Sequence, residues 1–314
     1  MSISVTLIAV VVALLLGHLA QSLAASVRHY DWFSTWLRWL DGRFPDGSFW
    51  RGRWGIVVAL LPPVLAVGLF QAALDEPLLG LVGLVFGVVV LFYAWGPRDL
   101  DLDVQAIVDA PDTAARRAAA ARLWPEGATP ALDGASLVEA VFRNALLRWF
   151  GVLFWFLLLG PMGALLYRLT ALAAEGPGAS SLPYETRSGA RRLMAILDWP
   201  VAQLMTLSLA LVGNFDTVLG VWREAGGAMF QLDTRFLGAA ARASVKCELA
   251  EEAADYIDDA GNAEAGEGGL PPPPPALQPS GDVPELRDAM SLVWRILLVW
   301  LAVLALFVIA GWVN

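Results

Sequence analysis

The stretch Phe142–Leu169 has the sequence FRNALLRWFGVLFWFLLLGPMGALLYRL. From Trp149 onward it is long and apolar enough to enter a lipid bilayer, whose hydrocarbon core takes about 20 apolar residues to cross as a helix. Gly160, Pro161 and Gly163 interrupt the run, because proline breaks the helical hydrogen-bond ladder and glycine loosens it. We therefore predict a broken membrane helix from Trp149 onward, which kinks or re-enters the bilayer.

The rest of the chain has the composition of a membrane protein. Of its 314 residues 57% are hydrophobic and only 16% are charged, and the mean hydropathy is +0.59, unlike soluble globular domains. Four stretches have the length and apolarity of firm spans: Ile3–Leu23, Trp54–Leu74, Leu78–Trp95 and Leu292–Val313. The predicted fold class is all-α: a polytopic membrane helical bundle with these spans, a broken or re-entrant helix, an amphipathic helix and cytoplasmic helical segments.

The amphipathic helix is predicted over Pro200–Trp222. On a helix its polar residues Gln203, Thr206, Asn214 and Thr217 fall on one narrow face, opposite Leu and Val. Such a helix either lines a polar groove between spans or lies in the plane of the membrane interface.

Basic residues indicate the orientation, since Lys and Arg concentrate in cytoplasmic loops. They are frequent in three segments, Arg28–Arg53, Arg98–Arg148 and Arg223–Lys246, which we predict to lie in the cytoplasm, and absent from the Asp75–Pro77 turn, which we predict to lie in the periplasm. We therefore predict a multi-pass protein of the bacterial inner membrane, with the lipid bilayer as its first partner. The net charge of -9 excludes nucleic acid as a partner.

An acidic segment followed by five consecutive prolines, Pro271–Pro275, separates the last span from the rest of the chain. Low apolarity and consecutive prolines cannot form a packed core. We divide the chain into a membrane domain over 1–248, a disordered acidic, proline-rich linker over 249–285 and a C-terminal transmembrane helix over 286–314.

Charged and amide residues flank the broken helix and the amphipathic helix, and we predict that they enclose a cationic groove facing the cytoplasm. The candidate ligand-binding residues are Arg98, Asp99, Arg143, Asn144, Arg168, Arg192, Gln203 and Asn214, beside the helix break at Gly160, Pro161 and Gly163. A kink that only lets helices pack is the alternative. We predict no catalytic residue, metal site or cofactor, since the usual phosphate-binding, hydrolase and zinc patterns are missing.

Three runs of sequence together resemble the AmpE membrane proteins: Phe142–Leu169, GPRDL from Gly96 and LDWPVAQLMTLSLALVGNF from Leu197. AmpE is similar in turn to the CobD/CbiB family, membrane synthases that join an aminopropanol unit to adenosylcobyric acid. That family has a SENTxDG-like pattern where this chain has 143–151, and an NTLD-like pattern where this chain has 169–172. Apart from Asn144 the polar residues of these patterns are missing, which implies that the scaffold is kept and the synthase chemistry lost.

The resemblance to AmpE implies a non-enzymatic inner-membrane regulatory protein, which modulates signalling linked to cell-wall state and β-lactamase induction. An anionic cell-wall-derived ligand in the groove, or a cytoplasmic protein recruited by the linker, would be its partner. Two alternatives stay open: a divergent cobalamin-type amide-bond-forming synthase and a small-solute transporter. The missing polar patterns disfavour the first, and the lack of visible internal repeats disfavours the second.

Overall fold

The computed structural model describes residues 7–14, 27–74, 80–96, 99–125, 127–263 and 283–310, and of residues 255–263 only the backbone. Within these ranges the chain is helical and contains no strand, so the predicted all-α polytopic membrane bundle is confirmed. The helices are α3 (Asp31–Arg43), α4 (Gly55–Leu74), α5 (Gly80–Ala94), α6 (Leu100–Val108), α7 (Thr113–Ala120), α8 (Gly134–Ala145), α9 (Gly151–Leu159), α10 (Pro161–Glu175), α11 (Tyr184–Val212), α12 (Phe215–Glu224), α13 (Arg235–Ala263) and α14 (Pro284–Ile309).

Among the described residues, four helical runs are long and apolar enough to cross a membrane: α4, the continuous run α8 to α9, α11 and α14. The predicted spans at Trp54 and Leu292 correspond to α4 and to the second part of α14, whereas α5 is a shorter apolar helix. The predicted span Ile3–Leu23 lies outside the described residues, apart from a helical stretch over 7–14.

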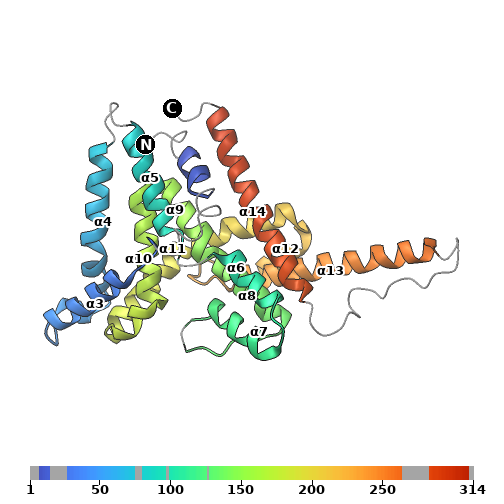
Figure 1. Ribbon diagram of the computed structural model, residues 1–314, viewed down its shortest axis with the longest axis horizontal. Helices are drawn as coiled ribbons and strands as arrows, with labels where there is room; N and C mark the ends of the chain where they lie inside the picture. The colour runs from blue at the N-terminus through green and yellow to red at the C-terminus, as the bar shows by residue number, and fades with distance from the viewer. Residues whose placement is uncertain are drawn as a thin grey trace.

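Helices α4, α5 and α14 stand upright in Figure 1, while α13 projects sideways. We call the end at which α4 begins, α5 ends and α14 begins the basal end; it is the lower end in that view and carries α3 and α7. The run α8 to α9 forms the centre of the bundle, since 67% of its most apolar window is buried, against 17% for α4. Helix α4 therefore faces the lipid along most of its length.

The predicted helix break is present at Gly160, where the chain reverses direction. Gly160 has a φ of 71°, and Pro161 begins α10 directly after it. A Cβ on Gly163 would lie 2.1 Å from the carbonyl oxygen of Trp155. Helices α9 and α10 therefore form a close antiparallel hairpin, and whether it crosses the membrane or re-enters it stays a prediction.

The side chain of Gln71, near the end of α4, holds the tip of this hairpin. Its amide nitrogen donates to the carbonyl oxygen of Leu159 at 3.2 Å, and its amide oxygen accepts from the backbone N–H of Met162 at 3.1 Å. Backbone groups freed by the break are thereby satisfied inside the protein, as an apolar environment requires.

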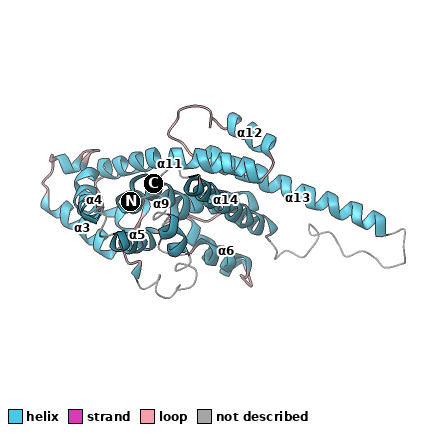
Figure 2. Ribbon diagram, turned by 90° about the horizontal axis from the view of Figure 1, so that it is seen from above, coloured by secondary structure: helices cyan, strands magenta, loops and turns pink. Residues whose placement is uncertain are grey.

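The prediction of one amphipathic helix over Pro200–Trp222 is wrong at both ends. Helix α11 begins at Tyr184, contains Pro200 in its interior and ends at Val212. The side chain of Asn214 then accepts the backbone N–H of Thr217 and begins α12, so that it caps a new helix. In Figure 2, α11 runs across the molecule from the side of α3 and α4 towards α12 and α13.

Helix α13 continues to Ala263 and therefore includes the first part of the predicted linker. Residues 264–282 lie outside the described ones, as do 311–314 at the end of the predicted C-terminal helix. The division of the chain into domains stays a prediction.

Candidate functional site

A cavity of about 720 Å³ opens at the basal side of the bundle, between α8, the end of α12 and the start of α13. Its charged lining consists of Arg143 and Glu139 from α8, Glu224 from α12, and Arg235 and Arg242 from α13. The cavity is therefore walled by charges of both signs, an arrangement that suits a ligand with anionic and cationic groups.

Two ion pairs order part of this lining. Arg143 Nη2 lies 2.5 Å from Glu175 Oε1 at the end of α10, and Arg242 Nε lies 2.9 Å from Glu139 Oε1. All four side chains are partly exposed, with between 39% and 46% of their surface accessible. A ligand can therefore compete for these side chains, since exposed ion pairs contribute little to stability.

A buried carboxylate and phenol lie next to this lining. The hydroxyl of Tyr167 donates to Asp198 Oδ1 at 2.6 Å, and it also lies 3.3 Å from the carbonyl oxygen of Leu146, a residue of the cavity wall. Glu175 and Arg143 are close enough to Asp198 to interact with it electrostatically. The cavity wall and this buried pair therefore belong to one polar network.

A π-helical turn over Leu146–Phe150 joins α8 to α9 at this point. Such turns are rare and occur often at functional sites, because the extra residue in the turn alters the direction of side chains. Here the turn releases the carbonyl oxygens of Leu147 and Arg148 towards Arg168, whose Nη2 lies 3.3 and 3.5 Å from them.

Arginines also cluster at the junction of α5 and α6. Arg168 Nε donates to the carbonyl oxygen of Ala94 at 2.6 Å, and Arg148 Nη1 donates to Asp103 Oδ2 at 2.8 Å. Gly96 has a φ of +123°, and a Cβ there would lie 3.3 Å from both arginine side chains. These arginines are held by backbone carbonyl groups and one carboxylate, so their evident role is to hold helices together.

Arg28, which precedes α3, belongs to the same region. It is 7% exposed, its Nε donates to the carbonyl oxygen of Phe92 at 3.0 Å, and its guanidinium lies 4.6 Å from the centre of the Phe92 ring. Its Nη2 is buried without a hydrogen-bond partner among the described residues. Arg28 also lines a cavity of about 250 Å³ beside α3.

The predicted site residues are divided among several places. Arg143 lines the basal cavity, whereas Arg192 lines a different one, of about 680 Å³, between α4 and α11. Asp99 caps α6 by accepting the backbone N–H of Asp101. Arg98 lies outside the described residues.

The predicted amide residues have mainly structural partners. Asn144 is 6% exposed and donates to two backbone carbonyl oxygens, each at 2.8 Å. Gln203 accepts from the indole N–H of Trp222 and donates to the carbonyl oxygen of Gly227, each at 2.8 Å, and so fixes the loop at the rim of the basal cavity. Ligand binding by any of these residues stays a prediction.

Several residues of this site are not among those predicted from the sequence. Glu139, Arg235 and Arg242 occur in mixed polar sequence, where no local pattern distinguishes them from a solvated surface. Tyr167 and Asp198 had a readable signal, since ionisable and polar residues inside or beside apolar membrane stretches are costly and usually functional.

These features define an all-α polytopic membrane protein with a buried polar network at the basal end of its bundle. The chain is 27% identical over 283 residues to the cobalamin biosynthesis protein CobD of Stutzerimonas stutzeri (strain A1501), a match that covers 85% of this chain and 84% of that protein. No family model matches the chain, and no solved structure matches it. The chain is thus a distant homologue of CobD, which supports the link to the CobD/CbiB family, while the closer resemblance to AmpE stays a prediction.

This comparison contradicts the regulatory function that we expected from the resemblance to AmpE. The relative that matches nearly the whole chain is a protein of cobalamin biosynthesis, so the prediction of a regulator of β-lactamase induction is wrong and the synthase alternative is favoured. The missing SENTxDG-like and NTLD-like patterns had weighed against this alternative, although individual polar residues can change between distant relatives.

Proposed function

We propose that this protein is a cytoplasmic-membrane enzyme of cobalamin biosynthesis, which forms an amide bond between a carboxylate of a corrinoid acid and an amino alcohol or its phosphate. The observation that carries the proposal is the similarity to CobD across 85% of this chain and 84% of the relative. Similarity over such a length involves the scaffold and the site region together.

The basal cavity supports the proposal by its size and charge. About 720 Å³ lies in the usual range of pockets for small ligands and cofactors. Arg143, Arg235 and Arg242 offer guanidinium groups to carboxylate or phosphate oxygens, and Glu139 and Glu224 offer carboxylates to an ammonium group. The substrates proposed above carry these groups. The large corrin ring would lie partly outside the cavity.

Amide formation also needs a group that takes a proton from the attacking amine. In the family patterns that this chain lacks, acidic residues are available near 143–151. Here carboxylates are supplied by Glu175, which pairs with Arg143, and by Asp198, which accepts a hydrogen bond from Tyr167. We assign the role of the proton acceptor to this pair of carboxylates, with Glu175 the more accessible of the two.

The test is turnover by membranes that contain the full chain. A corrinoid acid with one free carboxylate is incubated with an amino-alcohol phosphate, ATP and Mg²⁺. ATP would activate the carboxylate as an acyl phosphate or acyl adenylate, and the amine would then form the amide bond by displacing phosphate or AMP and losing a proton. The expected product has the summed mass of both substrates less one water. Arg143→Gln and Glu175→Gln should each lower kcat/KM by about 10²-fold or more, whereas Arg117→Gln, at an exposed position of α7, should leave it unchanged.

Absence of product with folded protein and several amino alcohols would overturn the proposal. If product forms but neither variant lowers its rate, the family assignment holds and the location of the site in the basal cavity is wrong.

A further inference from the structure

We propose that the groove between α4 and α11 binds an anionic glycerophospholipid, with its phosphate at Arg53 and Arg192 and an acyl chain along Val57 and Ile196. The groove has a volume of about 680 Å³ and is distinct from the basal cavity. This inference does not rest on the proposed enzymatic function.

The groove is polar at one end and apolar at the other. Arg53 is the second residue before α4, and Val57 lies one turn further along the chain. On α11, Arg192 and Ile196 are likewise one turn apart. Residues four apart on a helix lie on the same face, which applies to Arg192 and Ile196, while Arg53 in the turn before α4 lines the same groove as Val57. Each wall therefore presents an arginine followed by an aliphatic side chain.

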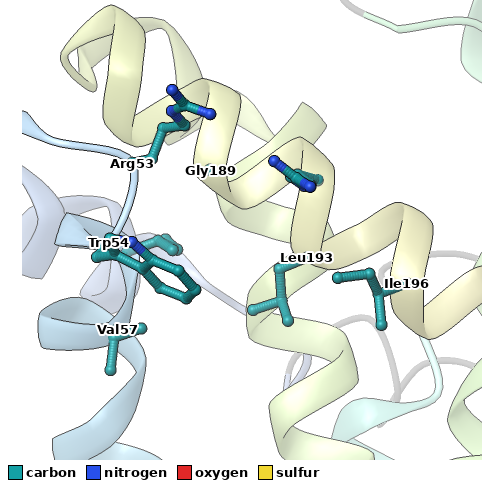
Figure 3. A pocket seen from close by; sticks show the side chains of 8 residues that line it. Arg53, Trp54, Val57, Gly189, Leu193 and Ile196 are labelled. Carbon is teal, nitrogen blue, oxygen red and sulfur yellow. The ribbon is translucent and has the colours of Figure 1, made fainter. Parts of the chain in front are cut away.

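Figure 3 shows the two walls facing each other, with Arg53, Trp54 and Val57 on one side and Gly189, Leu193 and Ile196 on the other. Helix α11 approaches the turn before α4 closely beside the groove, because a Cβ on Gly189 would lie 1.9 Å from the carbonyl oxygen of Arg53. The position of the groove is therefore fixed by backbone packing.

The groove lies at the level where the headgroup region of a membrane would meet its hydrocarbon core. The apolar run of α4 begins at Gly55, directly after Trp54, which is 71% exposed. Tryptophan is enriched at the level of the lipid headgroups, so Arg53 lies at that level and Val57, 39% exposed, lies in the hydrocarbon. A phospholipid has the same arrangement, with its phosphate at the headgroup level and its acyl chain in the hydrocarbon.

The charge of the polar end favours an anion. Among the described residues Arg192 has no carboxylate partner, and Arg53 lies 3.6 Å from Glu185, in a pair whose side chains are 62% and 51% exposed. Exposed pairs of this kind exchange readily with other anions. The basal end is also the predicted cytoplasmic side, where the leaflet is anionic and basic pockets between helices bind lipid headgroups.

The test measures lipid binding to the detergent-purified full chain by native mass spectrometry and by thermal melting. Phosphatidylglycerol is expected to remain bound and to raise the melting temperature, whereas phosphatidylcholine, which has no net charge, is not. The double variant Arg53→Gln with Arg192→Gln should weaken phosphatidylglycerol binding about 25-fold, since each arginine near an anionic lipid contributes about fivefold.

The matched control is Arg38→Gln with Arg117→Gln, which removes the same charge from two exposed arginines outside the groove. It should keep the wild-type response. The single variant Arg192→Gln, which breaks no ion pair, tests the site even if the double variant folds poorly. Equal binding of both lipids, an unchanged response in the Arg192 variant, or an equal effect of inorganic phosphate alone would overturn the proposal.

Discussion

Each of the buried arginines in the described part of the chain, Arg28, Arg148 and Arg168, donates at least one N–H group to a carbonyl oxygen or a carboxylate. Arg168 is 4% exposed and donates to the carbonyl oxygen of Ala94. Arg148 is 8% exposed and pairs with Asp103, which is fully buried. A charge taken out of water without such partners would be very costly, so these contacts fix how α5, α6 and α10 meet.

The buried pair makes Asp103 a sensitive position for stability. Replacing Asp103 by Ala would leave Arg148 buried without its carboxylate, and we expect a loss of about 3–5 kcal/mol in the free energy of unfolding. Asp101→Ala, on the same helix but partly exposed, should cost much less. Chemical unfolding of the detergent-purified protein, followed by tryptophan fluorescence, measures both. Equal, small losses would mean that Arg148 finds another partner.

At the scale of the elements, helices pack against each other closely at positions where only glycine fits. In the α9–α10 hairpin a Cβ on Gly151 would lie 2.0 Å from Cζ of Tyr167, so the position of Tyr167 beside Asp198 depends on the absence of a side chain at 151. The hairpin is therefore both the break in the membrane helix and the element that places the buried phenol.

Gly163→Ala tests how tightly the hairpin is packed. The added methyl group would lie 2.1 Å from the carbonyl oxygen of Trp155 and 2.7 Å from Cβ of Leu159, and separating the helices should cost about 1–3 kcal/mol of stability. We also expect weaker turnover, because the shift moves Tyr167. Thermal melting measures the loss of stability, and the synthase assay measures the loss of turnover.

Gly220→Ala is the control, since Gly220 lies within α12 and a Cβ there has no neighbour within 4 Å. Alanine is a better helix former by about 1 kcal/mol, so the melting temperature should stay the same or rise. A similar drop in both variants would contradict the tight packing of the hairpin.

At the scale of the whole molecule, the features predicted correctly from the sequence are those that depend on residues close together in the chain. Apolar length identified α4 and α14, and the glycines and proline at 160–163 identified the reversal. The prediction failed at Asn214, because it continued one helix past Gly213 although Asn214 is a typical N-cap residue that begins a new helix. It also grouped Arg143 with Arg192, which line different cavities, because the path of α11 across the bundle depends on tertiary contacts.

The predicted orientation of the whole molecule can be tested at Cys247, the one cysteine of the sequence. Cys247 lies on α13, in the segment that the distribution of basic residues puts in the cytoplasm. A membrane-impermeant maleimide should therefore label it in permeabilised or inside-out vesicles and leave it unlabelled in intact spheroplasts. Burial and the hydrogen bond to Glu251 raise the pKa of the thiol, so the reactive thiolate is scarcer and the labelling is best run near pH 8.

The matched variant carries Cys247→Ser and Pro77→Cys, which moves the thiol to the turn predicted outside the cytoplasm. It should react in intact spheroplasts, because the reagent reaches that side without crossing the bilayer. If Cys247 were labelled in intact spheroplasts and the second variant were not, the protein would have the opposite orientation in the membrane from the predicted one. The basal cavity would then face away from ATP, and a synthase that needs a nucleoside triphosphate could not work there.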